Sequence, residues 1–182
     1  MTLLARSNIN LNIFSGAISF WGLVKTPTSE SLQKTIDDVN SICEGPRFVP
    51  HLTFCSSPYP ASGQGKSNRF NPRDIIARLP EAISCRFRVS PEVHFSDNYT
   101  MSCCLILEEL GETTTKYKAI GDSIVSMTGG SPYTKPPHIS LHYGAIPAAS
   151  RQTVSRLITQ SAPSEVEIYK VAAVTSAPGV IP

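Results

Sequence analysis

The hydrophobic pattern of the chain has two periods. Apolar residues three or four positions apart predict helices, whereas short apolar runs rich in β-branched and aromatic residues predict strands. The helical pattern is clear after Thr28, where Leu32, Ile36 and Val39 share one helix face. The expected helices are residues 28–43, 71–84, 113–127 and 150–160. The expected strands are residues 17–24, 47–56, 85–97, 99–109, 137–143 and 165–175.

A helix, a strand and a second helix follow one another twice, in halves of similar length. This repetition predicts an α+β fold made of two pseudo-symmetric lobes. We expect antiparallel sheets whose inner faces form a central groove, with the helices outside. Pro50 lies inside the second expected strand and favours an edge strand or a bulge there. The expected domain covers residues 15–182, after an N-terminal extension at residues 1–14.

Composition and charge limit the possible partners. The chain has 182 residues and a net charge of +2, which does not suggest a protein that binds duplex nucleic acid. No apolar run approaches the roughly 18 residues of a membrane span. The five cysteines are odd in number and lack metal-ligand spacing, which indicates small core residues in a reducing compartment. We therefore expect a cytoplasmic monomer without a membrane partner.

Two short segments nearly repeat each other and carry the best chemical clue. They are Pro50-His51-Leu52-Thr53-Phe54 and Pro137-His138-Ile139-Ser140-Leu141. Residues two apart on a strand point from the same face, so each segment offers an imidazole beside a hydroxyl. Two such pairs facing one groove would supply a general base, a general acid and two hydrogen-bond donors for a tetrahedral anion. This set suits phosphodiester chemistry without a metal ion.

The two other histidines fit this pattern less well. His94 is also followed two residues later by a serine, but the charged Asp97 and a turn come directly after it. His142 lies four residues beyond His138, and we interpret it as a solvated strand end rather than as a residue behind the site. A single histidine on a strand is usually structural, so only the paired motifs are interpreted as catalytic.

The motifs and their surroundings resemble a known family, the plant and yeast cyclic phosphodiesterases of the 2H phosphoesterase superfamily. Their first motif is similar to the run Gly45-Pro46-Arg47-Phe48-Val49-Pro50-His51-Leu52-Thr53. Their second motif is similar to Ser131-Pro132-Tyr133 followed by Pro137-His138-Ile139-Ser140-Leu141-His142-Tyr143. Their opening segment is similar to Phe20-Trp21. The resemblance implies a bilobal 2H-type fold.

The resemblance also implies roles for individual residues. His51 and His138 would be the catalytic pair, with His138 as the base that activates water and His51 as the acid. Thr53 and Ser140 would bind the phosphate. The residues themselves do not decide which histidine is the base.

Two aromatic residues complete the implied site. Tyr143 would lie near the phosphate or the nucleotide, and Trp21 would border the groove, although a lone tryptophan on a strand is usually a core residue. Family members also have a further strand after the equivalent of residues 171–175. Three alternatives are open for this chain: the strand is lost, the segment at residues 9–14 replaces it, or the chain is a fragment of a longer polypeptide that contains it.

The implied reaction is hydrolysis of ADP-ribose 1″,2″-cyclic phosphate to the 1″-phosphate, and of nucleoside 2′,3′-cyclic phosphates to 2′-phosphates. No carboxylate cluster has metal-binding spacing, so we expect neither a metal nor another cofactor. The expected partner is a small nucleotide, because the chain has no long basic stripe that could follow RNA. Lys66, Arg69 and Arg73 are interpreted as solvated cations rather than as contacts to a second phosphate.

Two alternatives remain open. The same scaffold could serve RNA end processing or act as a 2′,5′-oligoadenylate phosphodiesterase, which would remove nucleotides from oligomers. The chain could also be a nucleotide-binding module without turnover, which would bind a 2′-nucleotide and hydrolyse no cyclic ester.

Overall fold

The computed structural model describes residues 2–3, 16–59, 70–81, 83–111 and 113–175. The helices in these ranges are α1 (Thr28–Ile42), α2 (Pro72–Arg78), α3 (Thr113–Thr128) and α4 (Ala148–Ser161), with a short 3-10 helix η1 (Tyr99–Met101). The strands are β1 (Thr2–Leu3), β2 (Gly16–Val24), β3 (His51–Tyr59), β4 (Cys85–Phe95), β5 (Cys103–Glu109), β6 (Ser131–Pro132), β7 (His138–His142) and β8 (Glu165–Thr175). The fold class is α+β, as the hydrophobic pattern predicts.

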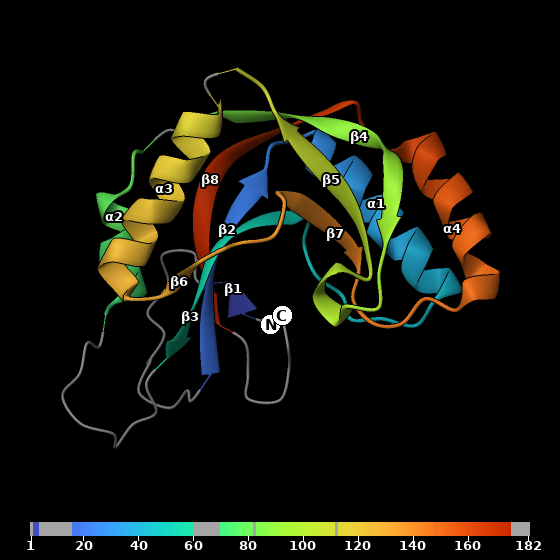
Figure 1. The fold of residues 1–182 in the computed structure, drawn as a ribbon, viewed down its shortest axis with the longest axis horizontal. Coiled ribbons are helices and arrows are strands. Elements are labelled where there is room, and N and C mark those ends of the chain that lie inside the picture. The colour runs from blue at the N-terminus through green and yellow to red at the C-terminus, as the bar shows by residue number, and fades with distance from the viewer. Residues whose placement is uncertain (1, 4–15, 60–69, 82, 112, 176–182) are drawn as a thin grey trace.

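The strands form one antiparallel sheet. Their order is β1-β8-β2-β3-β7-β5-β4, and β6 pairs with β3. An additional pairing between β4 and β8 closes this sheet into a barrel. In Figure 1, α2 and α3 lie on one side of the barrel, and α1 and α4 lie on the other. The helices therefore cover the outside of the sheet on two opposite flanks.

The two motif strands are neighbours within this sheet. β3 and β7 are joined in register at Leu52 and Ile139, and both side chains are completely buried. We expected separate sheets, but hydrogen bonding is continuous through this junction and through the β4–β8 pair. The edge interpretation of the first motif strand is also wrong, because β3 lies between β2 and β7. Pro50 lies just before β3 and removes no hydrogen bond from the sheet.

Local chemistry explains where the helices begin and end. Asn71 caps α2 by accepting a hydrogen bond from the backbone N–H of Arg73, and Pro72 occupies the first turn. α2 ends at Arg78 rather than continuing to residue 84, because Pro80 lacks the N–H that a helix interior needs. α1 begins at Thr28 and buries the apolar face that its sequence predicts.

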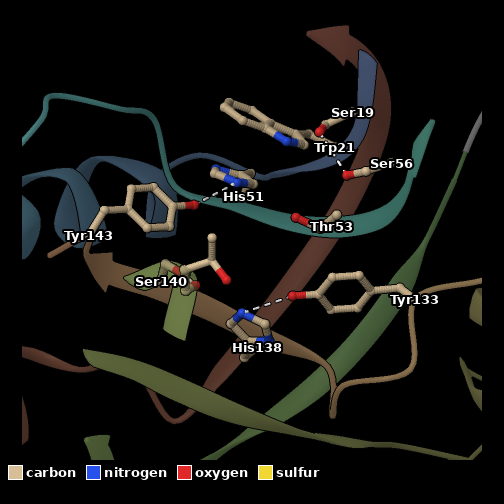
Figure 2. A pocket seen from close by; sticks show the side chains of 10 residues that line it. Ser19, Trp21, His51, Thr53, Ser56, Tyr133, His138, Ser140 and Tyr143 are labelled. Atoms are coloured by element: carbon tan, nitrogen blue, oxygen red, sulfur yellow. Dashed lines mark hydrogen bonds between the residues drawn. The ribbon is translucent and has the colours of Figure 1, made fainter. Parts of the chain in front are cut away.

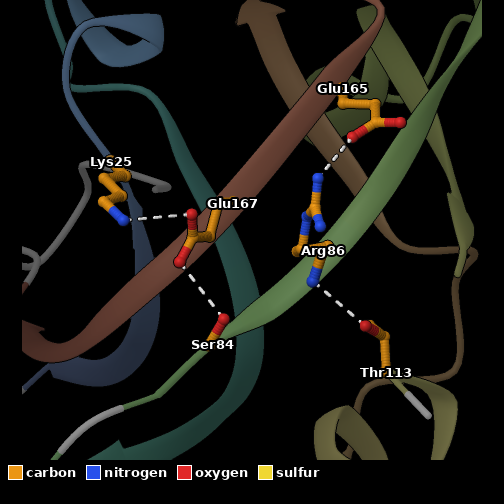
Figure 3. Close-up of polar contacts among 6 residues, drawn as sticks. All are labelled: Lys25, Ser84, Arg86, Thr113, Glu165 and Glu167. Atoms are coloured by element: carbon orange, nitrogen blue, oxygen red, sulfur yellow. Dashed lines mark hydrogen bonds and ion pairs between the residues drawn. The ribbon is translucent and has the colours of Figure 1, made fainter. Parts of the chain in front are cut away.

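Polar contacts lie beside the β4–β8 pairing that closes the barrel. Cys85 pairs with Ile168 where β4 meets β8. Around this seam, Glu167 accepts hydrogen bonds from Lys25 at 3.2 Å and Ser84 at 3.1 Å, as Figure 3 shows. In the same view Arg86 pairs with Glu165, and the backbone N–H of Arg86 donates to the hydroxyl of Thr113. These ion pairs are exposed, so burial of the apolar core rather than charge pairing holds the seam.

The core contains the cysteines that the sequence assigns to it. All five are buried and free, and they are Cys43, Cys55, Cys85, Cys103 and Cys104. Among the described residues, no helix is both long and apolar enough to cross a lipid bilayer. At the edge of the sheet, β1 pairs with the end of β8 at Thr175 and Val174. Residues 9–14, proposed above as a replacement strand, lie outside the described residues.

Candidate active site

A small cavity opens where β2, β3 and β7 meet. Its volume is about 130 Å³. The lining residues are Ser19, Trp21, His51, Thr53, Ser56, Thr100, Tyr133, His138, Ser140 and Tyr143. Figure 2 shows His51 and His138 on neighbouring strands with the cavity between their side chains. All six residues that the sequence assigns to the site are in this list.

Both histidines are held by the same backbone contact. The Nδ1–H of His51 donates to the carbonyl of Val49 at 2.7 Å, and the Nδ1–H of His138 donates to the carbonyl of Pro136 at 2.9 Å. Each acceptor precedes a proline, which restricts the residue before it to an extended conformation. The proline before each histidine therefore helps to aim the carbonyl. In the neutral rings the lone pair is at Nε2.

A tyrosine hydroxyl meets each of these Nε2 atoms. Tyr143 Oη lies 3.2 Å from His51 Nε2, and Tyr133 Oη lies 3.5 Å from His138 Nε2 (Figure 2). Because the neutral Nε2 is an acceptor, the tyrosines are the donors. Burial raises the pKa of Tyr133 to about 12, so its proton is retained near neutral pH. The sequence analysis did not assign Tyr133 to the site, although it lies five residues before its histidine just as Tyr143 lies five residues after.

Burial keeps both histidines neutral. His51 and His138 are each 4% exposed. The pKa of His51 is lowered to about 4, mainly by desolvation; the bond to Val49 acts the other way, and nearby His138 contributes a smaller decrease. The pKa of His138 is also lowered, mainly by burial and partly by the charge of Lys135. Two uncharged imidazoles therefore face the cavity at neutral pH.

The two motif hydroxyls are in different states. The Oγ–H of Ser140 donates to the carbonyl of Thr100 at 3.0 Å. Thr53 is half-buried and lines the cavity, and within the described chain its hydroxyl has no hydrogen-bond partner. Thr53 is therefore free to donate to a ligand, whereas Ser140 has to rotate its hydroxyl away from Thr100 first.

Each motif strand contains a β-bulge at the same position. In β3 the register passes from Cys55 to Thr53 opposite consecutive residues of β2, so Phe54 is the extra residue. In β7 the register passes from His142 to Ser140 opposite consecutive residues of β5, so Leu141 is the extra residue. A bulge directly after the hydroxyl residue changes which later side chains face the cavity. As a result, the residue five positions after each histidine lines the cavity.

The lining residues five positions after the histidines are Ser56, which follows His51, and Tyr143, which follows His138. Ser56 bonds across the cavity wall to Ser19, with 2.8 Å between the two Oγ atoms. The sequence analysis missed both serines. Strict alternation would have placed Cys55 rather than Ser56 beside Thr53, and nothing in the sequence of β3 marks the bulge.

The remaining histidines lie away from the cavity. His142 is completely buried, and its Nδ1 is 2.9 Å from Asn40 Oδ1 on α1. The interpretation as a solvated strand end is therefore wrong; the bulge in β7 turns this side chain toward α1. His94 is exposed on β4 and does not line the cavity.

The cavity is polar but uncharged. Of the lining residues, none is Asp, Glu, Lys or Arg, and seven carry hydroxyl groups. In the parts of the chain that the structure describes, no three His, Cys, Asp or Glu side chains are grouped so as to hold a metal ion. The lining residues themselves can transfer protons through imidazole and donate hydrogen bonds from hydroxyls.

Comparison with known proteins adds no family assignment. No protein-family model matches the chain, and the search of curated proteins finds no match. The interpretation of the site therefore depends on its own geometry.

Proposed function

We propose that this chain is a metal-independent cyclic phosphodiesterase of the 2H phosphoesterase type. Its substrates are ADP-ribose 1″,2″-cyclic phosphate, nucleoside 2′,3′-cyclic phosphates, or both. The observation that carries this proposal is the placement of two identically held imidazoles, His51 and His138, at one small cavity. Hydrolysis of a cyclic diester needs one proton removed from water and one delivered to the departing oxygen, and two histidines can perform both transfers.

The bilobal, pseudo-symmetric organisation is part of this proposal. Three features recur in both motif strands: the Nδ1 bond to a carbonyl before proline, the tyrosine at Nε2, and the bulge after the hydroxyl residue. Such repetition is expected if two similar lobes each contribute one half of the site.

The charge of the cavity favours a diester over a monoester. A cyclic phosphodiester carries one negative charge, whereas a phosphate monoester near neutral pH carries close to two. The lining residues offer hydroxyl donors and, after protonation of one imidazole, a single positive charge. Substrate is therefore bound better than product, and the second charge formed by hydrolysis promotes product release.

The size of the cavity favours a small reacting group. Its volume of about 130 Å³ is below the roughly 300–1,000 Å³ of typical ligand sites. The cyclic phosphate and part of its sugar occupy the cavity, and the remainder of the nucleotide lies outside it.

In the proposed reaction His51 is the general base and His138 the general acid. The pKa of His51, about 4, keeps its Nε2 unprotonated in neutral solution. His51 removes a proton from water as the water oxygen bonds to phosphorus. His138, protonated when the anionic substrate is bound, gives its Nε2 proton to the ribose oxygen as the P–O bond breaks. This assignment is the reverse of the one that the family resemblance implies.

The hydroxyls stabilise the charge on the transition state. Tyr143 and Tyr133 leave the imidazoles when substrate enters and donate to phosphate oxygens together with Thr53. Hydrogen bonds aimed at developing charge in a site without bulk water are among the largest contributions to catalysis. Ser140 joins them after its hydroxyl rotates from the carbonyl of Thr100.

A substrate panel tests this function. It includes ADP-ribose 1″,2″-cyclic phosphate, nucleoside 2′,3′-cyclic phosphates and 2′,5′-linked oligoadenylates, all assayed with a chelator present. We expect 1″- and 2′-phosphates as products, identified by phosphorus NMR. Stepwise shortening of the oligoadenylates would support the oligonucleotide alternative, and tight binding of a 2′-nucleotide without any turnover would support the binding module.

A further inference from the structure

Lys135 is a half-buried cation next to the candidate active site. It lies between Tyr133 and His138 in the chain, both of which line the cavity. Its Nζ donates to Thr100 Oγ1 at 2.9 Å, and Thr100 is itself a lining residue. Lys135 therefore places a positive charge beside an uncharged cavity without entering it.

No carboxylate compensates this charge in the part of the chain that the structure describes. The cations found in ion pairs there are Lys25, Arg86, Arg88, Lys118 and Arg151. Lys135 is not among them, and among the described residues its hydrogen bond is to a neutral hydroxyl. Partly burying a charge beside neutral groups costs free energy unless a partner of opposite charge arrives. A ligand anion at this position would be such a partner.

We propose that Lys135 binds a second phosphate group of the substrate, outside the cavity that holds the cyclic phosphate. This inference rests on the proposed cyclic phosphodiesterase function and specifies its substrate class. The preferred substrates are cyclic phosphodiesters whose sugar carries a further phosphate or pyrophosphate. A nucleoside cyclic phosphate with a free 5′-hydroxyl is then a poorer substrate.

The sequence offers three other candidate cations, Lys66, Arg69 and Arg73. Lys66 and Arg69 lie outside the described residues, and Arg73 on α2 lines a different cavity, between α2 and β8. Lys135 is linked to the catalytic machinery through Thr100, whose carbonyl accepts from Ser140. Its charge also reaches His138, because it lowers the pKa of that imidazole.

A purely structural role for Lys135 makes a different prediction. If Lys135 only fixed Thr100, its removal would disturb Ser140 and slow the hydrolysis of every substrate equally. If it binds a second phosphate, its removal harms the substrates that carry one more than those that do not. The ratio of kcat/KM between two matched substrates therefore separates the two roles.

The test uses adenosine 2′,3′-cyclic phosphate and the same molecule with an added 5′-phosphate. Wild type, Lys135→Met, Lys135→Arg and the control Lys34→Met are compared at low and high salt. Lys34 is exposed on α1, so its substitution removes the same charge away from the cavity. We expect wild type to favour the 5′-phosphorylated substrate by about tenfold, the scale of a charge-assisted hydrogen bond. Lys135→Met abolishes this preference, and Lys135→Arg and Lys34→Met retain it.

The preference of wild type should also weaken as salt rises, since salt screens a partly exposed charge pair. An equal loss on both substrates in Lys135→Met, or no preference in wild type, overturns the role of Lys135 and leaves the proposed function intact. Failure of wild type to hydrolyse both of these substrates and ADP-ribose 1″,2″-cyclic phosphate overturns the proposed function and this inference with it.

Discussion

The indole ring of Trp21 and the imidazole ring of His51 lie face to face. Their centroids are 3.5 Å apart, with an angle of 8° between the ring planes. Both side chains are almost completely buried, so the indole excludes water from one face of the imidazole. A charged imidazole is disfavoured where water is excluded, which is the main cause of the low pKa of His51. Trp21 is thus both a core residue and part of the cavity wall.

Replacing Trp21 with leucine should raise the pKa of His51. Water gains access to the ring face, so the pKa moves from about 4 toward its ordinary value of 6.5. If His51 is the base, the acid limb of the kcat/KM profile moves to higher pH by the same amount. An NMR titration of the His51 ring and a pH–rate profile measure the two shifts. Trp21→Phe, which keeps an aromatic ring there, should shift the pKa of His51 and the acid limb by smaller amounts. If Trp21→Leu shifted the pKa of His51 but left the acid limb of the kcat/KM profile in place, His51 would not be the base.

Stability should fall as the solution is acidified below pH 6.5. The folded pKa of His51 lies below its unfolded value, so the unfolded chain binds more protons between about pH 6.5 and pH 4. The stabilisation is complete above pH 6.5 and is lost as the pH falls through this window. For His51 alone the loss is about 3 kcal/mol. The lowered pKa values of His138 and His142 act in the same direction.

Urea unfolding at pH 7 and pH 4 measures this loss. His51→Gln carries no titrating ring there and should lose about 3 kcal/mol less between the two pH values than wild type. His94→Gln is the matched control, because His94 is exposed and its loss leaves the burial of the other histidines unchanged. Identical pH dependence in wild type and His51→Gln would show that burial does not depress this pKa.

Removing the hydroxyl of Thr53 should affect catalysis more than folding. Its hydroxyl faces the cavity and has no partner in the described chain, so Thr53→Val should leave the free energy of unfolding nearly unchanged. Loss of one donor to the transition state should lower kcat by about 10²-fold. Steady-state kinetics with a cyclic phosphate measures this change. Thr159→Val, on the exposed face of α4, controls for the substitution itself.

Removing the hydroxyl of Ser140 should lower stability as well as activity. Ser140→Ala leaves the carbonyl of Thr100 without its donor, so it should cost about 1 kcal/mol of stability in addition to activity. If Ser140→Ala alone reduced activity and Thr53→Val did not, the two hydroxyls would have the opposite importance to the one proposed.

Chelation should leave the reaction intact. Proton transfer by two imidazoles and hydrogen bonding by hydroxyls need no metal ion. Rates measured before and after treatment with EDTA, and again after adding Mg²⁺ or Mn²⁺, should agree. A loss on chelation that a divalent ion restores would require a metal in the mechanism.

The sequence predicts which motif residues line the cavity better than it predicts how the sheet around them closes. His51, Thr53, His138 and Ser140 could be found because strand geometry alone puts a histidine and the residue two positions on in the same face. The strand Glu165–Thr175 was also predicted at its observed bounds, since β-branched and aromatic residues recur along its whole length. Closure of the sheet was not predictable, because it depends on pairing between β4 and β8, which are far apart in the chain.

The omission of Ser56 and the error at His142 have one physical cause. A bulge adds a residue to β3 and to β7, and after it the alternation of faces no longer follows the sequence. That is why Ser56 faces the cavity and His142 contacts α1. Tyr133 could have been noticed, since it mirrors Tyr143 at an equal spacing from the second histidine.

The most direct test of the account is the hydrolysis of adenosine 2′,3′-cyclic phosphate by His51→Ala, His138→Ala and His94→Ala. All three histidines precede a hydroxyl residue by two positions, but only the first two line the cavity. We predict that wild type forms the 2′-phosphate, that His51→Ala and His138→Ala each lose about 10²-fold or more in kcat, and that His94→Ala matches wild type. Full activity in either of the first two variants, or an equal loss in His94→Ala, would contradict a mechanism in which two imidazoles act on one phosphorus atom.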